Sequence, residues 1–256
     1  MDQPAPSTRT TDRLRTHVVL AVICACAVWF LYEASPVVYR WYTADPKVLQ
    51  HADDFLARLS LALAYVAFGL LCATLSIGPL TVMRRGRVAA HLDVRRDVSI
   101  WAGIVSVVHG AVGLFVHYRG PGFVYYKAWI YYFVYPPSKP HTIPLRFDVF
   151  GFSNHTGVIA WLLCLPLLAI SNDYALRRLG TPRWKSLQRW NYALCGVVAI
   201  HSVLYQIVER RPFPFVMMFV VLAGWTCVVQ GVGYAQFRKR EALGGVDRDV
   251  PVSAGT

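Results

Sequence analysis

Six long apolar runs, separated by polar stretches, constrain the fold of this chain more than any other feature of its sequence. About 20 apolar residues in a helix span the ~30 Å hydrocarbon core of a bilayer, and a helix satisfies its own backbone hydrogen bonds there. The runs therefore predict an all-α fold, a polytopic membrane helix bundle with six transmembrane helices. They cover residues 18–32, 55–80, 98–117, 155–171, 191–208 and 213–234.

The composition agrees with a single membrane domain. Of the 256 residues, 55% are hydrophobic and 16% are charged, whereas a soluble protein carries about 25% charged residues. A net charge of +12 would suit a nucleic-acid partner, but the basic residues lie between the apolar runs. We therefore assign them to membrane topology and to lipid headgroups, and we expect no nucleic-acid binding.

The positive charges also predict the orientation of the chain. Most of the 26 Lys and Arg residues lie in the two tails and in loops at 84–96 and 177–189. Cytoplasmic loops are enriched in these residues, so we expect both termini in the cytoplasm and a multi-pass protein of the inner (plasma) membrane. The expected organisation is a cytoplasmic tail at 1–16, a membrane domain at 17–236 and a second cytoplasmic tail at 237–256.

Several boundaries depend on Pro, Gly and aromatic residues. The run at 18–32 is short enough for a signal-peptide core, but its bulky aromatic residues and the lack of a cleavage motif favour a retained span. Residues 33–54 are expected to form a polar loop that contains Pro36, and Gly78-Pro79 is expected to end the second span. The aromatic-rich segment 123–135 is predicted to lie at the outer membrane interface.

Six of the eight histidines lie in tails, in loops or near the ends of spans. Four are expected to be solvated side chains: His17, His51, His91 and His141. His117 and His155 lie near the outer ends of the third and fourth spans, where either one could touch a bound ligand. The six cysteines fall inside apolar runs without a CxxC pair, which predicts neither a disulfide framework nor a zinc site.

The other two histidines, His109 and His201, lie deep inside the third and fifth spans. An ionisable residue at such a depth is costly and marks a candidate functional site. His109 follows Arg96 by 13 residues, and His201 follows Arg189 by 12. At 1.5 Å per residue, both histidines lie roughly 18–20 Å from the cytoplasmic surface. Two histidines at one depth on parallel helices can face each other across the bundle.

A haem fits between such a pair, with one imidazole on each face of its iron. Two axial histidines leave no coordination position for oxygen, which favours electron transfer. Gly110 and Gly113, close to His109, would let a macrocycle or a neighbouring helix approach closely. The spacing is also consistent with two buried histidines that are hydrogen-bonded to neighbours, and with a proton relay.

No other motif in the sequence carries chemistry, and we assign no catalytic residue. The chain has no Gly-rich phosphate loop, no GxSxG and no HExxH sequence. About 20 residues follow the last span, too few for a flavin- or nicotinamide-binding domain. Reducing equivalents must then come from a membrane-soluble quinol or from a partner flavoprotein.

Three stretches within about residues 60–235 carry a resemblance to a known family. They are Gly78-Pro79-Leu80 with its basic loop, Arg95-Arg96 followed by His109, and the run from Pro166 through Arg177-Arg178-Leu179-Gly180 and Leu187-Gln188-Arg189 to His201. In this order the chain resembles the ferric reductase-like transmembrane domain family, and most closely the haem-binding membrane subunit of the periplasmic methionine-sulfoxide reductase system. The resemblance implies a b-type haem protein that passes electrons towards the outer face, to a partner such as a periplasmic acceptor protein.

One departure from the family is Gln188, where the family usually has a histidine. In two-haem relatives such as NADPH oxidases, histidines at this level hold an inner haem. The resemblance therefore implies one haem b, with His109 and His201 as axial ligands of its iron, in the membrane subunit of an oxidoreductase. Quinone is a second candidate cofactor. The alternative that Gln188 favours is a haem-free membrane protein on the same scaffold, serving transport or partner assembly. A cytochrome b561-like enzyme would usually need two histidine pairs.

Overall fold

The computed structural model describes residues 6–83, 88–116, 129–135 and 142–246. Within these ranges the regular structure is helical, apart from one isolated β-bridge between Val134 and Leu145. The elements follow in the order α1 (Pro6–Tyr42), α2 (Pro46–Asp53), α3 (Phe55–Met83), α4 (Val88–Gly113), the 3-10 helix η2 (Trp129–Tyr132), α6 (Val149–Ala169), α7 (Asp173–Gln188), α8 (Trp190–Val208) and α9 (Phe213–Val246).

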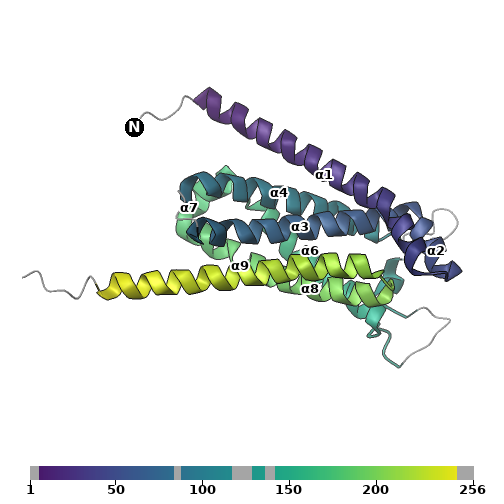
Figure 1. Ribbon diagram of the computed structural model, residues 1–256. Coiled ribbons are helices and arrows are strands. Elements are labelled where there is room, and N and C mark those ends of the chain that lie inside the picture. The colour runs from purple at the N-terminus through teal and green to yellow at the C-terminus, as the bar shows by residue number, and fades with distance from the viewer. Residues whose placement is uncertain (1–5, 84–87, 117–128, 136–141, 247–256) are drawn as a thin grey trace, which may run out of the picture.

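The long helices lie side by side in one elongated bundle (Figure 1). Helix α3 packs against α1, α4, α8 and α9, while α6 packs against α4 and α8. One end of the bundle carries α2 and the turn between α8 and α9, and the opposite end carries α7. We call these the α2 end and the α7 end. Because α3, α4, α6 and α8 surround one interior, residues far apart in the sequence meet there.

Five helical segments in the described part of the chain are long and apolar enough to cross a membrane: Arg13–Tyr42, Phe55–Thr81, Val149–Ala169, Asp173–Val208 and Phe213–Lys239. The expected multi-pass helical fold is therefore present. The expected span at 98–117 is not among the five. Helix α4 carries charged residues before position 98 and ends at Gly113, which leaves it a shorter apolar stretch. The number of spans found is thus five, where the sequence predicts six.

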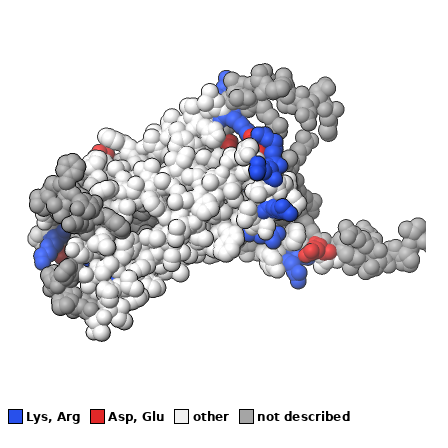
Figure 2. All heavy atoms as spheres, turned by 180° about the vertical axis from the view of Figure 1, so that it is seen from behind, with Lys and Arg blue, Asp and Glu red and all other residues white. Residues whose placement is uncertain are grey.

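The outer surface between the two ends is largely apolar. Trp29, Phe30 and Leu162 expose 67%, 68% and 66% of their surface. Figure 2 shows a broad band without charged side chains, and most of the visible Lys and Arg gather at the α7 end. A soluble protein rarely exposes such a continuous apolar surface, so this band is suited to lipid.

Helix α1 continues through Pro36 to Tyr42, so the loop expected at 33–54 is wrong over most of its length. A proline inside a helix removes the donor for the carbonyl four residues earlier, here the carbonyl of Tyr32. Three other donors reach that oxygen: Ser35 Oγ at 3.1 Å, and Arg58 Nε and Nη2 at 3.1 and 2.9 Å. The proline is tolerated because a side chain from α3 supplies the missing hydrogen bond.

Helix α3 likewise continues through Pro79 to Met83, so the prediction that Gly78-Pro79 ends this span is wrong. Pro79 deprives the Leu75 carbonyl of its helical donor, and Gln230 of α9 donates to that oxygen at 2.7 Å. Helix α9 approaches closely enough to do so because it has Gly233 at the contact, where a Cβ atom would lie 2.5 Å from the Pro79 Cβ.

Several other helices also extend beyond the ends that the sequence predicts. Helix α4 begins at Val88 and α6 at Val149, and the expected tails contain helix from Pro6 and up to Val246. The basic stretch at 177–189, expected as a loop, belongs mostly to α7. Four of the predictions fall outside the described residues: those for His117, for His141, for residues 123–128 of the aromatic-rich segment and for the side chain of His91.

Helix α7 starts with a side-chain cap and contains a sharp bend. The Asn172 side chain accepts a hydrogen bond from the Ala175 backbone N–H at 2.8 Å, which satisfies one of the free donors at a helix start. At Gly180 the backbone has φ 72°, a conformation that residues with a Cβ atom rarely adopt. This cap and this bend fold the basic segment back across the end of the bundle.

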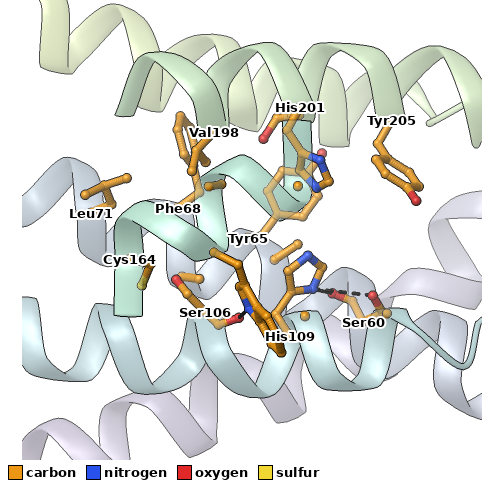
Figure 3. Close-up of a pocket in the computed structure, with 18 of the residues that line it drawn as sticks. Ser60, Tyr65, Phe68, Leu71, Ser106, His109, Cys164, Val198, His201 and Tyr205 are labelled. Carbon is orange, nitrogen blue, oxygen red and sulfur yellow. Dashed lines mark hydrogen bonds between the residues drawn. The ribbon is translucent and has the colours of Figure 1, made fainter. Parts of the chain in front are cut away.

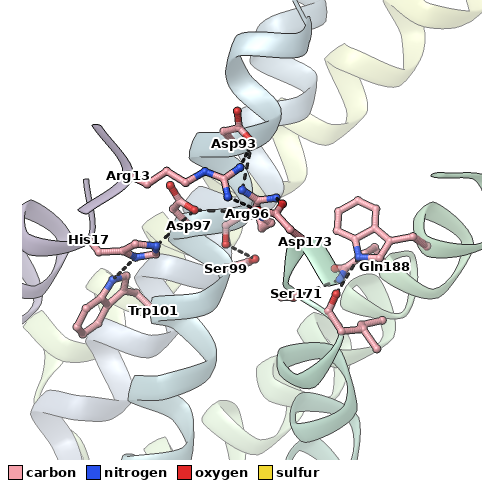
Figure 4. A network of polar contacts seen from close by, with 12 residues as sticks. Arg13, His17, Asp93, Arg96, Asp97, Ser99, Trp101, Ser171, Asp173 and Gln188 are labelled. Carbon is pink, nitrogen blue, oxygen red and sulfur yellow. Dashed lines mark hydrogen bonds and ion pairs between the residues drawn. The ribbon is translucent and has the colours of Figure 1, made fainter. Parts of the chain in front are cut away.

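A network of charged side chains ties α1, α4 and α7 together at the α7 end (Figure 4). Arg96 is 8% exposed; it donates to Asp173 on α7 and, at 3.2 Å, to Asp93 on its own helix. Arg13 of α1 donates to the same two carboxylates. His17 was expected to be solvated, but it accepts a hydrogen bond from Trp101 Nε1 at 3.3 Å.

We expect Arg96→Met to lower the free energy of unfolding by about 2 kcal/mol, because hydrogen bonds to charged groups contribute about 1.5–3 kcal/mol each. The measurement is detergent-based denaturation of the purified protein, with Arg238→Met as the control. Among the described residues, Arg238 pairs with Glu241 at 3.9 Å on the exposed surface, and such a pair contributes about 0–1 kcal/mol. Equal stability of the two variants would contradict this role for the network.

Candidate functional site

A cavity of about 810 Å³ runs along the inside of the bundle between α3, α4, α6 and α8. Its walls are rich in small residues, including Ser60, Ala64, Ala67, Gly103, Gly110, Gly113, Gly157 and Ala160. Protein interiors are close-packed and rarely leave large voids, and ligand pockets measure about 300–1,000 Å³. The small side chains thus leave space of the size that a ligand occupies.

His109 of α4 and His201 of α8 reach into this cavity from opposite sides (Figure 3). Their ring centres are 6.4 Å apart, and the ring planes are inclined by 74°. The structure therefore brings together the two histidines that the depth comparison singled out. They lie 92 positions apart in the sequence, and only the packing of α4, α6 and α8 makes them neighbours.

Each of the two imidazoles has a backbone acceptor for its Nδ1–H group. His109 Nδ1 donates to the Ser60 carbonyl at 3.0 Å, and His201 Nδ1 donates to the Ser153 carbonyl at 2.8 Å. A hydrogen bond of this kind fixes both the tautomer and the orientation of a ligand histidine. It leaves the lone pair of each Nε2 for a metal.

At two positions of the cavity wall, neighbouring side chains lie so close that only glycine fits. A Cβ atom at Gly157 would lie 2.9 Å from Cε1 and 3.1 Å from Nδ1 of His201. A Cβ atom at Gly110 would lie 2.3 Å from the indole Nε1 of Trp161, which donates to the Ser106 carbonyl at 3.3 Å. These contacts fix the position of the His201 ring and cover the cavity beside His109.

The two histidines fit a metal whose remaining ligands come from a cofactor and not from the protein. Among the residues that the structure describes, no group of three or more His, Cys, Asp or Glu is arranged to hold a metal ion. Metal–imidazole bonds of about 2.0–2.1 Å place two ring centres on opposite faces of one metal roughly 6 Å apart. The distance between His109 and His201 agrees, and a porphyrin supplies the remaining four nitrogens. The site therefore fits a haem.

The remaining sequence candidates lie elsewhere. His155 does not line the cavity; it stacks against Phe147 with ring centres 6.2 Å apart and donates from Nδ1 to the Gly151 carbonyl at 2.6 Å. Gln188 is also not part of the cavity wall. Its amide donates to Ser171 Oγ at 3.3 Å and accepts from Asn191 at 2.7 Å, so its side chain links the segment just after α6 to the start of α8.

Sequence reasoning missed two parts of the site. Tyr205 lies one turn beyond His201 with ring centres 4.9 Å apart, and its hydroxyl donates to Asn154 Oδ1 at 2.6 Å. A buried Glu209 pairs with His51 at the α2 end of the cavity. The spacing from His201 to Tyr205 is a helical i,i+4 pair and was visible in the sequence; the pairing of Glu209 with a distant histidine was not.

Comparison with known proteins agrees with the resemblance seen in the sequence. The chain is 25% identical over 233 residues to the protein-methionine-sulfoxide reductase heme-binding subunit MsrQ of Yersinia enterocolitica, covering 90% of this chain and 98% of that protein. MsrQ of Cronobacter sakazakii is 25% identical over 77% of this chain and 83% of its own length. MsrQ of Azospira oryzae is 36% identical over 74 residues, 28% of this chain and 32% of that protein.

No family profile matches the chain, and no solved structure does. The comparison therefore depends on the matches to MsrQ proteins. Their identity is low, but the match to the Yersinia enterocolitica protein covers nearly the whole chain. The resemblance that the sequence predicts is confirmed: this chain is similar to the heme-binding membrane subunits of methionine-sulfoxide reductase.

Proposed function

We propose that this chain is a b-type haem electron-transfer protein of the membrane, with one haem held between His109 and His201. The facing pair of imidazoles, 6.4 Å apart inside a cavity of small residues, carries the proposal. The names of the similar proteins, which call them heme-binding subunits, support it. When bound between two imidazoles, a haem supplies one-electron redox chemistry without an open coordination position.

The residues of this chain prepare the site in three ways. The Ser60 and Ser153 carbonyls hold the two Nδ1–H groups, so that both Nε2 atoms are available to the iron. Trp161 and Phe68 place large apolar surfaces on the cavity, which limits the access of water. Gly157 has no side chain and therefore leaves room for the His201 ring.

The orientation follows from the charges at the two ends. Basic residues gather at the α7 end (Figure 2), so we place that end in the cytoplasm and the α2 end outside. Helix α4 runs beside α3, and we propose that it forms the sixth crossing of the inner membrane. Both termini then lie in the cytoplasm.

Electrons would come from a membrane-soluble quinol or from a partner flavoprotein, and would leave at the outer face to a periplasmic acceptor protein. The similar proteins are named as subunits of a methionine-sulfoxide reductase, which supports a partner of this kind. Gln188 binds Ser171 and Asn191 rather than facing the cavity, which supports a single haem near the α2 end.

Proteoliposomes that contain the purified protein test this function. Dithionite should produce the α-band of a reduced b-type haem, and ferricyanide, which does not cross the membrane, should reoxidise chains whose α2 end faces outward. A protein without an α-band would be the haem-free alternative. If chains whose α2 end faces outward keep the reduced α-band after ferricyanide is added, delivery of electrons at the outer face is contradicted.

A further inference from the structure

A carboxylate and an imidazole form a close pair at the α2 end of the cavity. His51 Nε2 lies 2.5 Å from Glu209 Oε2, and the Glu209 side chain is only 3% exposed. Both residues line the same cavity as His109 and His201. A buried carboxylate is costly unless it has a partner, so a pair at this place calls for an explanation beyond stability.

The local backbone directs both side chains inward. Helix α2 is capped by Asp45, whose carboxylate accepts from the Lys47 N–H at 3.0 Å, and it presents His51 in its last turn. Helix α8 ends at Val208, and Arg210 adopts φ 47°, the left-handed conformation that commonly closes a helix. This turn leaves Glu209 and Arg211 on the cavity side.

Other polar groups of the α2 end are held by neighbours. Arg211 lines the cavity and donates to the Tyr39 hydroxyl at 3.1 Å. Gln206 donates to the Tyr65 hydroxyl at 3.0 Å, and that hydroxyl donates to the Phe215 carbonyl at 2.9 Å. These hydrogen bonds preorganise the polar groups at this end, and Tyr65 and Tyr205 add aromatic surfaces to the wall of the same cavity.

The pair is connected both to the histidines and to the outside. Glu209 follows His201 by eight residues, which is about 12 Å along a helix axis. The His51 side chain is 31% exposed, so a proton taken up by the pair has a route to water. The cavity thus joins a proton-accepting group at its end to the two imidazoles in its interior.

We propose that the α2 end of the cavity binds the headgroup of a membrane-soluble hydroquinone, and that the Glu209–His51 pair accepts its protons. Oxidation of one hydroquinone to a quinone breaks two O–H bonds and releases two protons and two electrons. The protons pass singly to the pair and from His51 to water. The two electrons would leave one at a time to the one-electron cofactor that His109 and His201 would hold, so this inference rests on the proposed function for their fate.

The chemistry of the pair suits a hydroquinone. A hydroquinone donates hydrogen bonds through its two hydroxyl groups, and the carboxylate of Glu209 accepts such bonds. The aromatic headgroup suits the tyrosine rings. A purely structural ion pair would need no place on the wall of a cavity.

The test compares Glu209→Gln and His51→Gln with Asp53→Asn, a control on the same helix as His51 whose exposed ion pair with Arg40 lies on the surface. Stopped-flow mixing with decylubiquinol should reduce the haem of both cavity variants at least tenfold more slowly than that of the wild type and the control. The dithionite-reduced spectrum should be the same in all four proteins.

Calorimetric binding of the quinol-site inhibitor 2-heptyl-4-hydroxyquinoline N-oxide gives a readout that does not depend on turnover. Its affinity should fall at least tenfold in Glu209→Gln and stay unchanged in Asp53→Asn. If the cavity variants keep the wild-type reduction rate and the wild-type inhibitor affinity, the inference is overturned. Loss of haem from the cavity variants would also overturn it, because the pair would then serve to hold the cofactor. Absence of haem from the wild type would instead overturn the proposed function.

Discussion

Replacement of His109 or His201 by alanine is expected to reduce the haem content of the purified protein more than tenfold. Each variant removes one of the two imidazoles that face each other at 6.4 Å. Loss even of groups that only support a metal ligand lowers metal affinity by about 10–100-fold, so loss of the ligand itself should have at least that effect. The reduced-minus-oxidised absorbance spectrum, normalised to protein, measures the result.

His155→Ala is the matched control for these two variants. His155 is also a histidine on a helix of the bundle, but it stacks on Phe147 and does not line the cavity. It should keep its haem. Equal haem content in all three alanine variants would show that the ligands are other residues.

Gly157→Val is expected to have the second largest effect, because it acts from a neighbouring helix on His201, one of the two proposed ligands. Even a Cβ atom at this position would lie 2.9 Å from the ring, and the two methyl groups of valine would take further space in the cavity. We expect haem content to fall at least fivefold while the protein remains in the membrane, since changes to groups that only position a metal ligand cost about 10–100-fold in metal affinity.

Gly196→Val provides the control for this substitution. Gly196 lies on α8 like His201, and a Cβ atom there would meet nothing within 4 Å. Its haem content should match the wild type, and its yield reports the effect of placing valine in a membrane helix. If Gly157→Val retained full haem content with an unchanged spectrum, the position of the His201 ring would not depend on this glycine.

The sequence predicted the helical membrane fold and the meeting of His109 with His201 because both follow from simple periodic rules. Apolar length reports a span, and the rise of a helix converts residue number into depth. The same arithmetic could not reveal the carbonyls of Ser60 and Ser153, since backbone groups leave no mark in a sequence. Nor could it reveal Gly157, whose role depends on the packing of α6 against α8.

The prolines show why the helix boundaries were harder to predict. Pro36 and Pro79 each break one backbone hydrogen bond, and a local rule therefore ends the helix. In the structure Arg58 and Gln230 supply the missing donors from other helices. The compensating residue lies 22 positions away in the first case and 151 in the second, so only the tertiary arrangement shows that the helices continue.

The number of haems per chain is the most direct measure of the central claim. The pyridine haemochromogen assay on purified protein of known concentration gives this ratio together with the haem type. One facing histidine pair, with Gln188 bound to Ser171 and Asn191, predicts one b-type haem for each chain. A ratio near zero, or a ratio near two, would contradict the account.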